Sequence, residues 1–218
     1  MDFFGEPAIS YFDHIYSDNL TAGKRTGDIP IGSFKGRGIF IAPESRISCS
    51  EFSIGEFSRI DGPSVIKGTG SCTIGKYCTI GGGVNIITGY NEMNRFNLLN
   101  SFQLDNNFRE LMPLDGDVRI KNNVWIGDNV LILSGIKIGD GAVVGSGSVV
   151  SNDLKPFSMS IGAPARTIRM RFSKSIVKQL MGIKWWHWPE DKISRNKQFF
   201  EADLSQNSDI ELANLIVP

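Results

Sequence analysis

The stretch from Ile120 to Val150 reads IKNNVWIGDNVLILSGIKIGDGAVVGSGSVV and repeats every six residues. An aliphatic residue opens each hexad, and a second apolar or small residue follows it four positions later. The opening positions are Ile120, Ile126, Ile132, Ile138, Val144 and Val150. An α-helix does not bury such a pattern, because six residues overshoot a full turn by about 240°. A long strand does not fit either, because its apolar period is two.

A short strand followed by a tight corner does fit a period of six, with Gly, Asn or Asp at the corner. Three such sides close a triangular coil. The pattern predicts that Ile120 stacks on Ile138, and that the next two hexads stack in the same way, Ile126 on Val144 and Ile132 on Val150. Successive coils then hydrogen-bond as parallel strands about 4.8 Å apart. A β-sandwich with frequent turns is the alternative, but a sandwich does not keep a period of six over so long a stretch.

The same repeat occurs earlier in the chain, which sets the predicted domain organisation. It occupies Ile54, Ile60 and Ile66, slips by two residues, and resumes at Ile74, Ile80 and Ile86, with Ile41 and Ile47 as a possible start. We therefore predict a mainly β protein with a parallel β-helix over 31–165, interrupted by an insertion at 87–117. Residues 1–30, rich in Phe and Tyr, are expected to cap the first coil.

Residues 166–218 are predicted to form a C-terminal helical region. Apolar residues recur every three to four positions from Phe172 to Ile183, with Ser173 as a possible N-cap. Pro189 is expected to open a second helix. The three tryptophans at 185, 186 and 188 either stack on a ligand ring or dock this region on the coil, and docking is favoured because large aromatics mostly supply buried area. The segment ELANLIV near the C-terminus is either a packed element or a tail.

Composition excludes several classes of function. Lys and Arg together number 23, as do Asp and Glu, so the net charge is zero and there is no excess positive charge for a nucleic-acid or membrane surface. No stretch approaches the ~20 apolar residues that span a bilayer. Cys49, Cys72 and Cys78 are an odd number inside apolar repeats, which indicates buried thiols in a reducing compartment. The expected location is the cytoplasm, and no metal is predicted.

These motifs resemble the left-handed β-helix, or hexapeptide-repeat, acyltransferases, and the nearest branch is the xenobiotic acetyltransferases, which include the type B chloramphenicol enzymes. The resemblance rests on NNVWIGDNV at 122–130, GAPAR at 162–166 and IKWWHWPEDKI at 183–193, and it covers roughly residues 30–195. It implies a left-handed coil, a homotrimer, and acetyl-CoA as acyl donor. Residues expected along the pantetheine arm are Trp125, Ser134, Gly135, Gly145 and Ser146, and those expected near the phosphates are Lys155, Arg166 and Arg169. Relatives carry a lysine where this chain has Asn152.

The insertion at 87–117 contains about thirty residues without hexads, and loops of that length inside a compact domain are usually functional. In the family this loop reaches across the trimer interface and covers the acceptor pocket. Tyr90 and Phe96 would supply apolar walls there, and Asn97 a polar contact. Alternatively, the aromatic residues only hold the loop against the coil.

The family loop begins with an Asn-His pair, whose histidine is the general base, and the resemblance aligns this pair with Asn91 and Glu92. The histidine is absent, because the only two in the chain are His14 and His187. Glu is roughly a hundredfold weaker as a base than His, so the hypothesis requires that Tyr90 and Phe96 keep the carboxylate dry.

The sequence therefore predicts a CoA-dependent acyltransferase, most simply an acetyltransferase acting on a hydroxyl or amine of a sugar or glycan precursor. Glu92 would be the base and Asn91 would orient the site. The alternatives are a non-catalytic trimer that binds a ligand or partner through the same pocket, and a structural β-helix with no CoA site.

Overall fold

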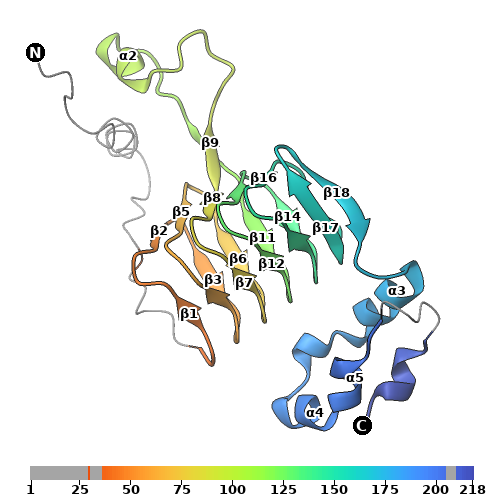
Figure 1. Cartoon of the computed structure of the whole chain (residues 1–218). Helices are drawn as coiled ribbons and strands as arrows, with labels where there is room; N and C mark the ends of the chain where they lie inside the picture. Colours follow the sequence, from red (N-terminus) through yellow and green to blue (C-terminus); the bar gives the residue numbers. More distant parts are fainter. Residues whose placement is uncertain (1–28, 30–35, 205–209) are drawn as a thin grey trace, which may run out of the picture.

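The computed structural model describes residues 29, 36–204 and 210–218. The predicted N-terminal cap at 1–30 and His14 lie outside these residues, except for Ile29. The described chain is a parallel β-helix, and its C-terminal part forms a group of short helices beside the coil (Figure 1). The fold class predicted from the hexads is confirmed as a parallel solenoid, and the left-handed sense stays a prediction.

Three sheets run along the coil, and each is built from strands of two to three residues until the last turn. Sheet A contains β1 (Phe40–Ile41), β4 (Arg59–Ile60), β7 (Thr79–Ile80), β12 (Trp125–Ile126), β15 (Val143–Val144), β17 (Ser158–Gly162) and β18 (Ala165–Met170). Sheet B contains β2 (Arg46–Ser48), β5 (Val65–Lys67), β8 (Asn85–Ile87), β13 (Leu131–Ile132) and β16 (Val149–Val150). Sheet C contains β3 (Phe52–Ile54), β6 (Cys72–Ile74), β11 (Val118–Ile120) and β14 (Lys137–Ile138).

The strand register confirms the stacking predicted from the hexads. Ile120 pairs with Ile138, Ile126 with Val144 and Ile132 with Val150, all in parallel. These inward-facing residues are buried to 1% exposure or less and form one continuous apolar column. Because the strands before the last turn are only two or three residues long, this column, and not the length of any strand, holds the sheets together.

The coil tolerates changes in the number of residues per turn. A turn takes 18 residues between Asn122 and Asp140, and 20 between Glu56 and Lys76. Across the insertion, 46 residues separate Lys76 from Asn122, yet Lys76 N–H still donates to the Asn122 side chain at 3.0 Å. Extra residues therefore leave at the corners and do not disturb the strand ladder.

The corner that joins sheet C to sheet A carries left-handed residues that are not glycine. Phe57, Tyr77, Asn123 and Phe157 have φ between 54° and 60°, a region that costs energy for most side chains. Each of these backbone N–H groups donates to a carbonyl of the preceding coil, as Tyr77 does to Glu56 at 3.1 Å and Phe157 to Asp140 at 2.8 Å. The corner bonds and the packing of the rings offset the strain.

The C-terminal helices pack on this same corner. They are α3 (Lys174–Ile183), η2 (Trp185–His187), α4 (Glu190–Arg195), α5 (Lys197–Glu201) and η3 (Leu212–Leu215). The Tyr77 ring lies 5.1 Å from that of Phe57 and 4.9 Å from that of Trp185, and Trp186 is fully buried. The tryptophans therefore dock the helices on the coil, as favoured above.

Two details of the helical region refine the sequence analysis. Ser173 caps α3 by accepting a hydrogen bond from Ile176 N–H at 3.3 Å, as expected. The helix expected after Pro189 is broken at Asn196, a buried residue whose side chain bonds to Lys192 and Val217. The ELANLIV segment is a packed element, because Leu212 is buried among the helices.

The three cysteines are buried free thiols, as predicted. Burial raises the pKa of the Cys78 thiol to about 11, and it raises the pKa values of Cys49 and Cys72 as well. In the part of the chain that the structure describes, no helix is long and apolar enough to cross a membrane.

Candidate functional site

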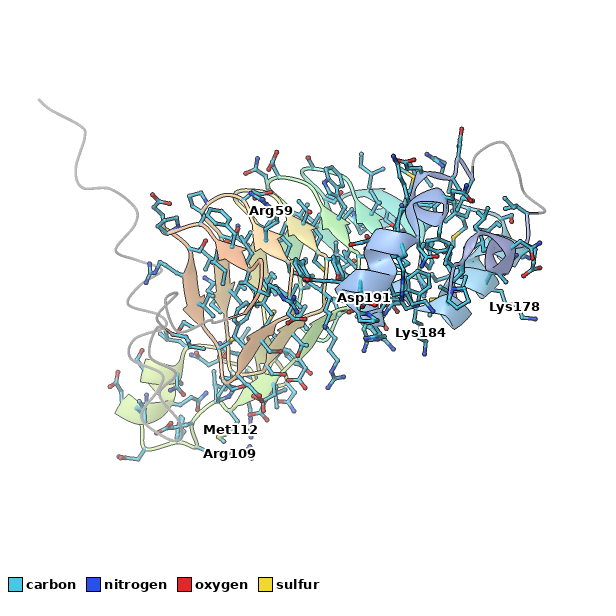
Figure 2. All side chains as sticks on the ribbon, turned by 90° about the horizontal axis from the view of Figure 1, so that it is seen from below. Arg59, Arg109, Met112, Lys178, Lys184 and Asp191 are labelled. Carbon is cyan, nitrogen blue, oxygen red and sulfur yellow. The ribbon has the colours of Figure 1, made fainter. Side chains whose placement is uncertain are left out.

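The insertion leaves the coil at the corner between sheets B and C. It starts as a two-stranded antiparallel hairpin of β9 (Gly89–Asn91) and β10 (Pro113–Asp115), and carries a short helix, α2 (Asn100–Asp105), at its far end. Figure 1 shows it projecting from the coil, and in Figure 2 the labelled Arg109 and Met112 lie apart from Asp191 on α4 and from Lys184, which follows α3.

Glu92 sits directly after β9, where its backbone N–H donates to the Met112 carbonyl at 3.2 Å and extends the hairpin by one rung. Its side chain is only 14% exposed and lies between two guanidinium groups. Oε1 is 3.6 Å from Arg95 Nη2, and Oε2 is 3.7 Å from Arg109 Nη2. Both distances are too long for a hydrogen bond, and Oε2 is buried without a hydrogen-bond partner.

The apolar walls expected around Glu92 are not formed within one chain. Phe96 is fully exposed and Tyr90 nearly half exposed, because the loop turns these rings outward from the hairpin. Asn97 serves the loop itself, since its side chain accepts a hydrogen bond from Leu99 N–H at 2.8 Å. Asn91 is exposed at the end of β9. Of these four residues, only Asn91 directly adjoins Glu92 in the chain.

Several residues expected near CoA lie on the outer face of sheet A. Trp125 pairs with Val143, Val143 with Met159, and Met159 with Arg169, so these four side chains form one outward row. The β17–β18 hairpin shifts register between Met159 and Ser160. Because of this bulge, Arg166 and Arg169 lie opposite Ile161 and Met159, two positions apart, and share the outward face.

The neighbouring corner, between sheets A and B, holds the next part of this surface. A Cβ added to Gly145 would lie 3.0 Å from the Ile161 side chain, so the glycine lets Ile161 pack closely against the backbone at this corner. Ser146 accepts a hydrogen bond from Asp128 N–H at 3.1 Å. We call this group, made of Trp125, Gly145, Ser146, Arg166 and Arg169, the basic half-site.

Ser134 and Gly135 lie elsewhere, at the corner between sheets B and C, beneath the insertion. Gly135 N–H donates to the Gly116 carbonyl at 3.0 Å, and Gly116 is the residue that follows β10. A Cβ on Gly135 would meet nothing within 4 Å, so the backbone there is open to a ligand. We call Asn91, Glu92, Ser134 and Gly135 the loop half-site.

Lys155 belongs to neither half-site. It is exposed just after Leu154, which bridges to Ile138 in sheet C, and therefore lies near the corner between sheets C and A. Arg166 lies at the other end of the β17–β18 hairpin, near the turn at Gly162. One chain thus brings the sequence-predicted residues into two groups on different corners of the triangle, and leaves Lys155 apart.

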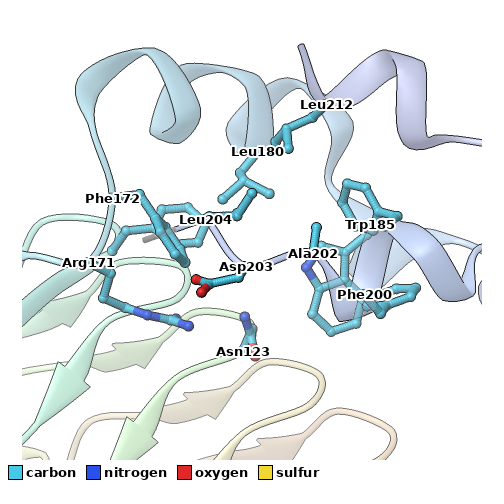
Figure 3. A pocket seen from close by; sticks show the side chains of 12 residues that line it. Asn123, Arg171, Phe172, Leu180, Trp185, Phe200, Ala202, Asp203, Leu204 and Leu212 are labelled. Atoms are coloured by element: carbon cyan, nitrogen blue, oxygen red, sulfur yellow. The ribbon is translucent and has the colours of Figure 1, made fainter. Parts of the chain in front are cut away.

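A pocket of about 390 Å³ lies between the coil and the C-terminal helices, and none of the sequence-predicted site residues line it. Figure 3 shows the Arg171, Asn123 and Asp203 side chains on one side of it and the Trp185 and Phe200 rings on the other. Arg171 donates to the Gly141 carbonyl at 2.8 Å and lies 4.9 Å from the Phe172 ring centre. These contacts tie the helices to the coil.

Sequence reasoning did not assign a role to Arg95 or Arg109. Arg95 is three residues from Glu92, but neither lies in a helix, so this spacing does not predict an ion pair. Arg109 is 17 residues from Glu92 and meets it only because the loop folds back. No cluster of three or more possible metal ligands occurs among residues 29, 36–204 and 210–218.

Comparison with known proteins agrees with the repeat. Residues 117–152 match the bacterial transferase hexapeptide family, described as six repeats. A chloramphenicol acetyltransferase from Morganella morganii is 42% identical over 43 residues, which are 20% of this chain and 20% of that protein. One from Escherichia coli is 35% identical over 49 residues, 22% of this chain and 23% of that protein. The alignments thus span about a fifth of these relatives' length.

Solved structures with a similar trace include a hexapeptide-repeat acetyltransferase from Vibrio cholerae, with TM-score 0.49 and 24% identity over 64% of this chain and 74% of that one. A galactoside acetyltransferase in complex with coenzyme A has TM-score 0.42 and 23% identity over 60% of this chain and 64% of that one. Residues 117–152 are thus similar to the bacterial transferase hexapeptide family, and the register of the parallel coil follows the matched repeats.

Proposed function

We propose that the protein is a CoA-dependent acyltransferase, most simply an acetyltransferase, which works as a homotrimer on a hydroxyl or amine of a sugar-like acceptor. The observation that carries the proposal is the division of the expected site into two half-sites on different corners of one triangular coil. Neither half-site is complete, because the basic half-site lacks a base and the loop half-site lacks the arginines of β18 that are expected near the CoA phosphates.

A threefold axis would join the two halves. In a cyclic trimer each contact is heterologous, so one surface of a subunit meets a different surface of its neighbour. Parallel coils would then set the loop half-site of one subunit beside the basic half-site of the next. The exposed apolar side chains of the insertion support this arrangement, because monomers rarely expose so many together. They are Tyr90, Met93, Phe96, Leu98, Leu99, Phe102, Leu104, Phe108, Met112 and Leu114.

The chemistry rests on a buried carboxylate oxygen without a partner. Oε2 of Glu92 accepts no hydrogen bond in the free chain, so an acceptor hydroxyl or ammonium would satisfy it. Acetyl-CoA would supply the thioester. The acceptor forms a bond to the acyl carbon, the carbon–sulfur bond breaks, and Glu92 carries the proton from the acceptor to the departing thiolate. Asn91, next to Glu92, would orient the acceptor.

The direct test is consumption of acetyl-CoA across a panel of monosaccharide, amino-sugar and nucleotide-sugar acceptors, together with calorimetric titration of CoA. Turnover on any acceptor supports the proposal. CoA binding without turnover favours a non-catalytic trimeric binding protein. Failure to bind CoA at millimolar concentration would indicate a structural β-helix.

Co-expression of two impaired chains is expected to restore activity if the site lies between subunits. One chain carries Glu92→Gln and the other Arg166→Gln with Arg169→Gln. In each mixed trimer one of the three interfaces joins two intact half-sites, so about a third of the wild-type rate should return at subsaturating acetyl-CoA. Two tags purify the mixed species, and each chain expressed alone is the control. No recovery would mean that both half-sites serve the same subunit.

Replacing Arg166 and Arg169 by Gln is expected to weaken CoA binding by about 2 to 4 kcal/mol. Each charged hydrogen bond contributes about 1.5 to 3 kcal/mol, and exposed arginines give the lower part of that range. Lys155→Gln, measured separately, reports whether the outlying lysine also reaches a phosphate. Lys178→Gln, on the exposed face of α3 (Figure 2), is the matched control. Unchanged CoA affinity in calorimetry would assign both arginines to the solvated surface of the hairpin.

A further inference from the structure

The insertion has only two basic residues, Arg95 and Arg109, among five acidic ones. Both of these arginines lie against the same carboxylate, that of Glu92. The insertion has more acidic than basic residues, so its two arginines could pair with exposed acids, yet both lie beside the largely buried carboxylate of Glu92. The approach of both arginines to one carboxylate therefore indicates a function at this position of the loop.

Neither arginine forms a close ion pair with Glu92. The two guanidinium groups carry two positive charges against one carboxylate, and neither reaches hydrogen-bond distance from it. The Arg109 side chain is 65% exposed and that of Arg95 39%, so most of their donors face solvent. Guanidinium donors are suited to planar binding of carboxylates and phosphates. The cluster thus offers an acceptor oxygen on Glu92 and cationic donors on both sides of it.

The other acidic residues of the insertion do not neutralise the positive charge of Arg95 and Arg109. Asp117 is committed to the Ser71 N–H at 2.9 Å and to Arg119 at 3.0 Å, and the first of these bonds holds the pKa of its carboxyl below the ordinary value. Glu110 adjoins Arg109 in the chain, yet no ion pair joins it to either arginine among the described residues. The exposed acids act at longer range, where salt screens them.

We propose that the acceptor is anionic, a sugar whose carboxylate or phosphate binds Arg95 and Arg109 while its hydroxyl or amine donates to Glu92. Binding of that anion would draw the guanidinium groups off Glu92 and release the carboxylate to act as a base. A neutral sugar would leave the arginines on Glu92. This inference rests on the proposed function and adds the class of acceptor to it.

The test compares sugars with the same ring: D-glucose, D-glucuronate, in which a carboxylate replaces the C6 hydroxymethyl group, and D-glucose 1-phosphate, in which a phosphate is esterified to the C1 hydroxyl. We expect kcat/KM to be about 10- to 100-fold higher for an anionic member, the effect of one charged hydrogen bond. The glucuronate and phosphate arms distinguish the two sources of charge. Arg109→Gln should collapse the anionic-to-neutral ratio towards one, and Arg109→Lys should restore part of it. Arg119→Gln, an exposed arginine paired with Asp117 outside the cluster, should keep the ratio.

Failure of this inference is distinct from failure of the proposed function. Turnover with equal kcat/KM on glucose and glucuronate would overturn the anionic acceptor and leave the transferase standing. Calorimetric binding of glucuronate or glucose 1-phosphate to CoA-loaded protein, lost in Arg109→Gln but without turnover in wild type, would support the anion site and remove the transferase. If neither anionic probe binds or reacts, the inference is wrong. If Arg109→Gln were less stable but kept the wild-type ratio of kcat/KM for anionic and neutral acceptors, Arg109 would only stabilise the loop, and the inference would be wrong.

Discussion

Replacing Glu92 by Gln is expected to lower the turnover number about 10²- to 10⁴-fold and to leave CoA affinity unchanged. Gln keeps the shape of the side chain but cannot take a proton, and losses of this size are typical when a general base is removed. Stopped assays of acetyl-CoA consumption give the turnover number, and calorimetry gives the CoA affinity. Glu110→Gln, a half-buried carboxylate of the same loop outside the cluster, is the matched control.

Glu92→His provides a second readout at the same position. The histidine rebuilds the Asn-His pair with Asn91, and imidazole is the stronger base, so some activity towards a hydroxyl acceptor should return relative to Glu92→Gln. A Gln variant as fast as wild type would exclude Glu92 as the base. His14 or a basic group on the acceptor would then be the remaining candidates.

The largest expected loss of stability comes from Ile126→Ala. Ile126 is fully buried, with Ile80 on one side along sheet A and Val144 on the other. Removing a buried aliphatic side chain to Ala costs about 2 to 5 kcal/mol, because a cavity remains where the contacts were. Urea unfolding measures the free energy, and the protein concentration is held fixed because dissociation of the proposed trimer would make the result depend on it.

Ile126→Val calibrates that measurement. It removes one carbon from the same place, and we expect a loss of about 0.5 to 1.5 kcal/mol. If Ile126→Ala cost no more than Ile126→Val, the column of aliphatic residues would not be the close-packed core of the coil, and the stability would have to reside in the corners and helices.

The coil was predictable because its period has one physical solution. Hexads alone gave the stacking of Ile120 on Ile138, and the slip of two residues between Ile66 and Ile74 appears as a longer turn of the same ladder. The loop was less predictable, because its hairpin pairs Tyr90 with Leu114 and no repeat in the sequence predicts that pairing.

The residues of the candidate site differ in the same way in how well the sequence predicts their positions. Residues inside the repeat, such as Trp125 and Gly145, have positions fixed by the register. Glu92 was found only through the resemblance to a family, and its contact with Arg109 depends on how the loop folds back. The exposure of Phe96 was not foreseen, because the sequence does not say which chain a ring would cover.

The uninterrupted ladder beneath the insertion makes the loop an exchangeable part. Gly89 pairs with Asp115 at its base, so the two ends are held together by the hairpin, while β6 and β11 pair beneath as if nothing lay between them. The entropy cost of closing a flexible loop rises by only about 0.6 kcal/mol for each doubling of its length. Loops of other lengths and compositions can therefore be grafted between Thr88 and Gly116 at little cost to the coil, and under the proposed function such a graft would change the acceptor while the proposed CoA surface stays as it is.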